Sequence, residues 1–164
     1  MFPKRIIPGP GQESVWDYPR PPRMENSEAH IRVILNDITI AETRKALRVL
    51  ETSHPPVYYI PPADVQLKYF QKTSRGGWCE WKGHWKLYSI NIDHTLIEHA
   101  AWHIPDPIAD FAAIKNYIAF YAGKMDACYV NDERVMPQPG DFYGGWITAN
   151  IVGPFKGEPG TMGW

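Results

Sequence analysis

Two residues that can do chemistry lie three positions apart, within the segment from Arg75 to Tyr88. Cys79 carries a thiol, and Lys82 carries an ammonium group that can stabilise a thiolate or bind an anion. A reactive thiol needs positively charged and partly exposed surroundings. Free cysteines are otherwise among the most buried residues, where they behave as small apolar side chains. The chemistry therefore depends on whether the fold brings Cys79 and Lys82 together.

Interpreted as one strand, this segment separates the two residues, because successive side chains point to opposite faces. The apolar face holds Cys79, Trp81, Trp85 and Leu87, and the charged face holds Glu80, Lys82, His84 and Lys86. We therefore expect Cys79 to be a buried core residue. A thiol-dependent enzyme using Cys79 and Lys82 is the alternative. A turn or bulge at Lys82-Gly83 would favour that alternative, because it would bring both side chains into one pocket.

Other charged residues are candidates for holding a polar ligand. Arg44 and Arg48 could join Lys82 in binding an anion, although solvated surface charge explains such residues equally well. Glu51 and Asp126 are the acidic candidates, either for hydrogen bonding a ligand or for pairing those cations.

The sequence predicts no metal and no cofactor. Cys79 and Cys128 are the only two cysteines and form no CxxC pair. His99 and His103 would need a helix to share a ligand face, and their segment has the pattern of a strand. We expect these two histidines, with His54 and His84, to be structural or surface residues.

Composition limits the class of protein. The chain has 164 residues, which suits a single domain, and a formal net charge of −1. It contains no long apolar run, so we expect no membrane span. Two unpaired thiols favour a reducing, cytoplasmic location. The basic and aromatic run from Lys68 to Lys86 resembles a single-strand nucleic-acid platform, but the near-neutral charge disfavours nucleic acid as a partner.

The pattern of residues predicts three regions. Residues 1–29 are rich in proline, and Trp16 and Tyr18 predict an extended arm packed on the domain. Residues 30–136 have the alternation of a β core domain. Residues 137–164, rich in glycine, proline and aromatic residues, are expected to wrap around its surface.

Within the core the spacing predicts mostly strands. The strands and hairpins expected are a hairpin over 31–40 around Asn36-Asp37, an edge strand over 57–60, a strand over 67–70, a turn over 74–77, a strand over 96–104 ending at Pro105, and a hairpin over 127–135. Residues 44–51 fit either a helix or a strand. Asp106-Pro107 resembles a helix start, so we expect a helix over 107–116, with a strand over 117–121 as the other interpretation of its end.

Several segments in the same order carry a family resemblance. They are Ile40-Ala-Glu-Thr-Arg-Lys-Ala-Leu-Arg-Val-Leu-Glu51, Pro56-Val-Tyr-Tyr-Ile-Pro61 with Asp64-Val65, Cys79-Glu-Trp-Lys-Gly83, Ala100-Ala-Trp102, Pro105-Asp-Pro107, and Tyr117-Ile-Ala-Phe-Tyr121 with Asp126. Together they resemble an uncharacterised family, the domain of unknown function 427, which is also filed as nucleotidyltransferase-like. The ends of the chain resemble those of a longer-chain subgroup.

The resemblance implies a β-tent (Mss4-like) fold, in which two antiparallel sheets meet at one edge with a pocket between them. Many such proteins hold zinc through paired CxxC knuckles, which this chain lacks, so we predict no zinc. The family usually has proline where Glu80 stands, which puts the sharp turn at this point in question. A Gly-rich phosphate loop is missing too, and we do not adopt the transferase label.

The sequence therefore predicts a mainly β protein with two antiparallel sheets and one or two short helices. We expect it to bind a small polar or anionic molecule in an aromatic-lined cleft between the sheets. The residues expected near this ligand are Arg44, Glu51, Tyr59, Cys79, Lys82 and Trp102. The alternatives are the thiol-dependent enzyme and a nucleic-acid or protein interaction module, and a homodimer is left open.

Overall fold

Strands occupy most of the chain, and the helical segments are short. The computed structural model describes residues 2–164 and is mainly β, as the sequence predicts. Every helical segment within these residues is a 3-10 helix: η1 (Val15–Asp17), η2 (Pro62–Asp64), η3 (Leu67–Tyr69), η4 (Ala109–Ile114) and η5 (Ala122–Lys124). None of these helices is long and apolar enough to cross a membrane.

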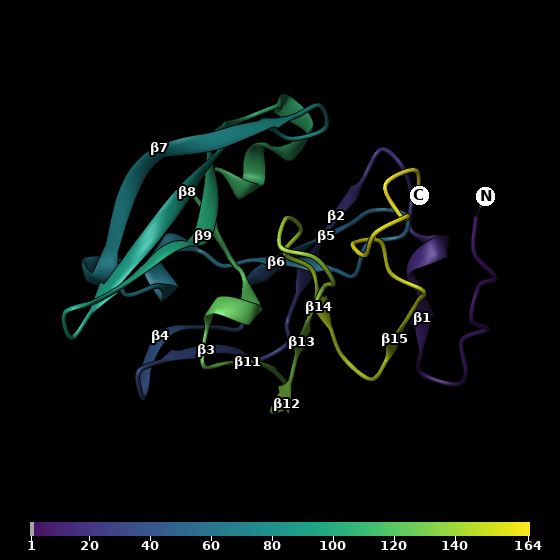
Figure 1. Ribbon diagram of the computed structural model, residues 1–164, viewed down its shortest axis with the longest axis horizontal. Coiled ribbons are helices and arrows are strands. Elements are labelled where there is room, and N and C mark those ends of the chain that lie inside the picture. Colours follow the sequence, from purple (N-terminus) through teal and green to yellow (C-terminus); the bar gives the residue numbers. More distant parts are fainter. Residues whose placement is uncertain (1) are drawn as a thin grey trace.

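The longest strands form a four-stranded antiparallel sheet, seen in teal and green in the upper left of Figure 1. Its strands, in spatial order, are β10 (Ile118–Phe120), β9 (Thr95–Pro107), β8 (Gly83–Ile92) and β7 (Phe70–Cys79). We call it the central sheet, because the other large sheets pack against it.

A second four-stranded antiparallel sheet contains both predicted hairpins. Its strands are β12 (Glu133–Arg134), β11 (Ala127–Val130), β3 (Ile31–Leu35) and β4 (Ile38–Thr43). Asn36 and Asp37 join β3 to β4, and Asn131 and Asp132 join β11 to β12, all four with positive φ. Both hairpins are thus confirmed, and they use residues that tolerate the left-handed region.

A third sheet includes most of residues 44–51, the segment whose sequence fits either a helix or a strand. It consists of β2 (Arg23–Ser27), β5 (Ala46–Leu50) and β6 (Val57–Tyr59). Residues 46–50 form its middle strand, which is confirmed as a strand because pairing on both sides outweighs local helix propensity. β6 lies at the edge, as its flanking prolines predict.

Both faces of the central sheet are buried at β10 and the middle of β9. Ile118 and Phe120 in β10 join a core cluster with Ile31 and Val33 of the second sheet, whereas Ala119 between them joins another cluster. That other cluster contains residues of the third sheet and of the central sheet: Leu47, Val49 and Tyr59 with Trp102 and Ile104. Alternate side chains of one strand therefore pack on opposite sides.

The two ends of the chain lie together, on the right in Figure 1. Parallel pairing joins β1 (Glu13–Ser14) to β15 (Ile151–Val152), and the tail adds an antiparallel pair, β13 (Met136–Pro137) with β14 (Trp146–Ile147). Trp16 and Tyr18 are buried, and the Trp16 indole donates to the Pro154 carbonyl at 2.9 Å. The division into arm, core and wrap stays a prediction, as does the β-tent subgroup.

Two sequence predictions around β7 are wrong. Residues 67–69 form η3 and not a strand, and the 74–77 segment lies inside β7 and does not form a turn. Gly76 and Gly77 serve a different purpose: a Cβ on Gly76 would lie 1.9 Å from the Trp85 carbonyl oxygen, and one on Gly77 would lie 2.6 Å from the Trp85 ring. Glycine at these two positions permits the close approach of β8. A propensity scale cannot distinguish a glycine with this role from a glycine in a turn.

The predicted helix over 107–116 is also wrong in length and type. β9 continues past Pro105 to Pro107, because Asp106 and Pro107 pair with His84 and Gly83 of β8. Only residues 109–114 are helical, and β10 follows shortly after, which confirms the strand interpretation of residues 118–120.

Candidate functional site

A tight turn at residues 80–82 joins β7 to β8. The Lys82 amide donates to the Cys79 carbonyl at 3.3 Å, and Gly83 has φ +115°, a conformation that favours glycine. The single strand expected for this segment is therefore wrong. The turn forms with Glu80 in place of the family's proline, and it brings Cys79 and Lys82 to the wall of one cavity.

This cavity has a volume of about 440 Å³, within the usual range for small-molecule sites. It lies between the central sheet and the third sheet, and the C-terminal tail closes one side of it. Eight aromatic side chains line it: Tyr59, Trp78, Trp81, Trp85, Trp102, Tyr121, Phe142 and Tyr143. Trp78 and Phe142 are largely exposed to solvent, at 59% and 63%.

Three aromatic residues in contact form its deeper wall. The Trp102 indole donates to the Tyr59 hydroxyl oxygen at 3.2 Å, and the Trp102 and Tyr121 rings lie 4.7 Å apart. The Tyr121 hydroxyl donates to the Phe142 carbonyl of the tail at 3.1 Å. Burial raises the pKa of Tyr121 to about 12, so this phenol is neutral at physiological pH.

Lys82 places a positive charge beside this wall. Burial opposes its charge and lowers the pKa of the Lys82 ammonium, but Tyr59, Cys79 and Glu51 nearby outweigh burial and raise it overall. Lys82 is therefore charged at neutral pH. Among residues 2–164, none of the ion pairs within 4 Å includes Lys82.

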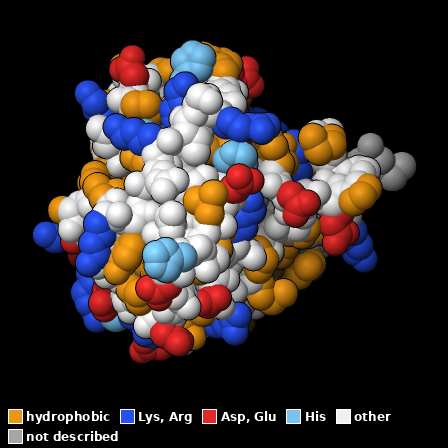
Figure 2. Space-filling model, turned by 60° about the vertical axis from the view of Figure 1, so that its left-hand side comes forward, with side chains coloured by type: hydrophobic (Ala, Val, Ile, Leu, Met, Phe, Trp, Pro, Cys, Tyr) orange, Lys and Arg blue, Asp and Glu red, His pale blue; other side chains and the backbone are white. Residues whose placement is uncertain are grey.

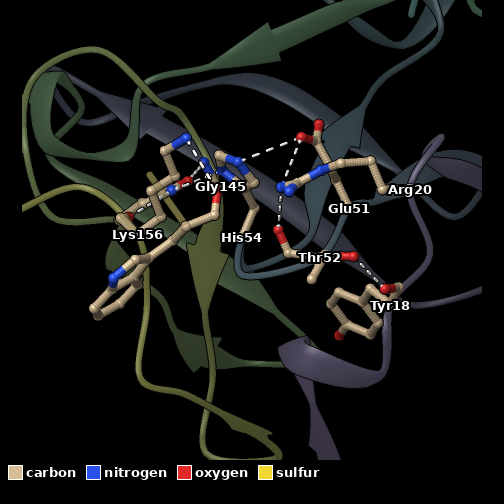
Figure 3. Close-up of polar contacts among 9 residues, drawn as sticks. Tyr18, Arg20, Glu51, Thr52, His54, Gly145 and Lys156 are labelled. Carbon is tan, nitrogen blue, oxygen red and sulfur yellow. Dashed lines mark hydrogen bonds and ion pairs between the residues drawn. The ribbon is translucent and has the colours of Figure 1, made fainter. Parts of the chain in front are cut away.

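A polar network forms the wall contributed by the segment after β5 (Figure 3). Glu51 Oε2 lies 3.3 Å from Arg20 Nη2 and 3.6 Å from His54 Nε2. Arg20 also donates to the Thr52 carbonyl at 2.8 Å. The carboxylate thus has a cationic partner from the N-terminal region.

Gln138 fixes the protonation of His54. The Gln138 amide oxygen accepts from the Gly145 amide at 3.0 Å, so its nitrogen is the group that faces the Lys156 carbonyl at 2.8 Å and His54 Nδ1 at 3.0 Å. That nitrogen can only donate, so Nδ1 accepts and the neutral imidazole carries its hydrogen on Nε2, toward Glu51.

The His54 imidazole is neutral under ordinary conditions. Burial, followed by the charges of Lys156, Arg20 and Lys82, lowers the pKa of His54 to about 3. Its ring also packs edge-on against Tyr143 at 4.7 Å. His54 is therefore a hydrogen-bond donor of fixed orientation and does not add to the positive charge of the cavity.

Five of the six residues expected near a ligand line the cavity: Glu51, Tyr59, Cys79, Lys82 and Trp102. Arg44 does not, because it is exposed in the turn between β4 and β5. Arg48 instead pairs with Glu13 and Glu25.

Asp126 is also away from the cavity, where it accepts from the Asn36 amide. Within the described chain no group of three or more His, Cys, Asp or Glu side chains is arranged to hold a metal ion.

Sequence reasoning missed the residues that come from the two ends of the chain. Gln138, Tyr143 and Lys156 line the cavity, and Arg20 holds Glu51. Each lies far along the chain from its partner, and no local spacing signals such contacts. The aromatic residues of the tail are the one indication in the sequence that the tail packs against the rest of the chain.

Comparison with known proteins gives a family but no activity. No curated protein matches the chain. The model of an uncharacterised family, described as a domain of unknown function (DUF427), matches residues 23–131, about two thirds of the 164 residues. The match includes Cys79, Lys82, Glu51 and His54 but not Arg20 or the tail. The chain therefore belongs to the DUF427 family.

Proposed function

We propose that the protein binds a small organic anion in the cavity, with the anionic group at Lys82 and an apolar or planar body between the aromatic side chains. The observation that carries this proposal is the Lys82 ammonium, which faces an aromatic-lined cavity and has no carboxylate within ion-pair distance in residues 2–164. A cation in such a place attracts an anion through charge-assisted hydrogen bonds.

Neither acid on the cavity wall forms an ion pair with Lys82, although Glu51 is near enough to raise its pKa. Glu51 is already partnered by Arg20, and its side chain is only 21% exposed. Glu80 also lies on the cavity wall but is exposed, so water and salt screen it. Lys156 also lines the cavity, where its Nζ lies 5.5 Å from the centre of the Tyr143 ring.

The aromatic walls favour a ligand with a flat or apolar part. Trp102, Tyr59 and Tyr121 hold one another in place through ring contacts and the Trp102 hydrogen bond. Preformed aromatic surfaces of this kind bury ligand area without much loss of side-chain entropy.

A thermal-shift and calorimetric titration tests this proposal with matched probes. Inorganic phosphate and benzoate are small anions, and adenosine monophosphate combines an anionic group with a large planar body. Benzamide is the neutral counterpart of benzoate. We expect at least one anion to raise the melting temperature by mass action, and benzamide to have little effect. Lys82→Met should abolish the shift and Lys82→Arg should restore part of it. Lys115→Met, at an exposed lysine away from the cavity, should leave the shift unchanged.

Two results would contradict the proposal: no stabilisation by any anion at millimolar concentration, or equal stabilisation of Lys82→Met and the unchanged protein. A single-stranded oligonucleotide serves as the second probe. Basic and acidic side chains are interspersed on the face in Figure 2, so we expect only weak, salt-sensitive binding. Tight binding at physiological salt, weakened by Trp78→Ala or Lys86→Ala, would favour a nucleic-acid module instead.

A further inference from the structure

The Cys79 thiol lies where a ligand in the cavity would meet it. Cys79 is the last residue of β7, is half-buried, forms no disulfide, and lines the same cavity as Lys82. The hydrogen bond from the Lys82 amide to the Cys79 carbonyl makes these two residues the ends of one tight turn. Access and proximity to a cation are the two conditions that separate reactive thiols from structural ones.

The other cysteine meets neither condition. Cys128 in β11 is 1% exposed and packs in the core cluster between the central and second sheets. Burial raises the pKa of the Cys128 thiol to about 12. The same chain therefore supplies an internal comparison between a thiol that shares an open cavity with Lys82 and a thiol buried in the core.

The charge on Lys82 acts on the molecules that enter the cavity. Lys82 lines the same cavity as Cys79, and its ammonium attracts negatively charged molecules, which raises their concentration beside the sulfur. A neutral reagent of the same size gains no such effect.

We infer that Cys79 is a nucleophilic site for small anionic electrophiles, which Lys82 draws to the sulfur. This inference rests on the proposed anion binding and adds a covalent step to it. The thiol proton leaves to water, the thiolate sulfur forms a bond to the electrophilic carbon, and that carbon's bond to its leaving group breaks. The leaving group departs with the electron pair, and Lys82 keeps its proton.

Iodoacetate and iodoacetamide test this inference, because they differ in charge and hardly in size. In each case the sulfur bonds to the methylene carbon and iodide leaves. Labelling is followed by mass spectrometry of intact protein and of the Cys79 peptide, in a Cys128→Ala background. We expect the rate ratio of iodoacetate to iodoacetamide at Cys79 to exceed that of free cysteine by about fivefold or more at low salt. Added phosphate should slow the iodoacetate reaction.

Variants at one position identify the source of the selectivity. Lys82→Met should bring the ratio down to that of free cysteine, Lys82→Arg should keep it raised, and Lys115→Met should not change it. Melting temperatures are recorded for each variant, so that loss of fold is distinguished from loss of charge. Cys128 in a Cys79→Ser background should be labelled only on unfolding.

The results separate this inference from the proposed function. A Cys79 that reacts no faster with iodoacetate than free cysteine does, in protein that still binds anions through Lys82, would overturn the nucleophile and leave anion binding intact. A raised ratio that persists in Lys82→Met would overturn the role of Lys82. Absence of both anion binding and selective labelling would overturn both proposals.

Discussion

At the scale of single residues, His54 is the clearest case of an environment that sets a chemical state. Its Nδ1 accepts from Gln138, its Nε2 hydrogen faces Glu51, and three nearby cations disfavour protonation. A histidine that must remain neutral in the folded protein links stability to pH. The polar wall of the cavity therefore depends on the same network that holds the tail in place.

This linkage predicts that the free energy of unfolding falls as the solution is acidified below about pH 6.5. The pKa of His54 is about 3 in the folded protein and about 6.5 when unfolded, so between these values only the unfolded chain takes up the proton. Stability due to His54 is fully present above pH 6.5 and declines toward pH 3, with a loss of about 2 kcal/mol by pH 5. Urea unfolding at pH 7.5 and pH 5 measures it.

His54→Asn is the matched variant, because an asparagine oxygen can replace Nδ1 as the acceptor for Gln138. The variant should lose much of the decline between pH 7.5 and pH 5. A smaller part should remain, because burial also lowers the pKa of His103. A decline of equal size in both proteins would show that His54 is not its source.

Five of the six residues that the sequence suggests for a ligand site lie on the cavity wall, and whether they bind a ligand stays a prediction. Glu51, Tyr59 and Trp102 lie on three different strands or their ends, and the pocket that the resemblance implies is what groups them. Arg44 is a candidate because of its charge, but it lies in an exposed turn away from the cavity. Charge at the surface carries little positional information, whereas buried aromatic residues must be packed somewhere.

At the scale of elements, turn prediction from the sequence succeeded at the Asn-Asp pairs and failed at the Gly76-Gly77 pair. The Gly76-Gly77 pair suggested a turn and instead lets β7 pass close to Trp85. The true turn lies a few residues later, at positions with no strong turn residue before Gly83. Local propensity located the hairpins at Asn-Asp pairs correctly, because only backbone conformation is at issue there.

The Gly144-Gly145 pair gives the tail its place against the cavity. A Cβ on Gly144 would lie 2.2 Å from the Trp102 ring, which is itself packed against Tyr59 and Tyr121. We predict that Gly144→Ala lowers the free energy of unfolding by about 1–3 kcal/mol through overpacking. It should also weaken anion binding, because the tail or Trp102 must move.

Gly163→Ala provides the control, because no atom lies within 4 Å of the position its Cβ would take. Thermal unfolding and the anion titration are measured on both variants. If Gly144→Ala matched Gly163→Ala in both measurements, the close packing of the tail on Trp102 would be contradicted.

At the scale of the whole molecule, both ends of the chain contribute to the cavity and to one another. Arg20 reaches Glu51 from the N-terminal region, while Gln138 and Lys156 reach His54 from the tail. These contacts involve residues outside the range that the family model matches. Composition predicts that aromatic ends pack, but the partners of each ring depend on the tertiary arrangement, which no pattern within a segment encodes.

Trp16 joins the two ends and tests whether they stabilise the domain. Its ring lies 5.6 Å from Trp164, its indole donates to Pro154, and it packs in a cluster with Leu50 of the third sheet. We predict that Trp16→Ala lowers the free energy of unfolding by about 3–5 kcal/mol, as loss of a buried aromatic side chain does. For a chain of this size the melting temperature should fall by roughly 10 °C.

The unfolding of Trp16→Ala should remain a single transition, because the cluster joins the arm, the third sheet and the tail in one packed unit. Phe2→Ala is the control: Phe2 touches the same ring at 5.9 Å but is 69% exposed, so its loss should cost little. Limited proteolysis should cut the Trp16 variant near both ends and leave the Phe2 variant as resistant as the unchanged protein. A stable Trp16→Ala protein, or one whose ends melt in a separate transition, would show that the core folds without them.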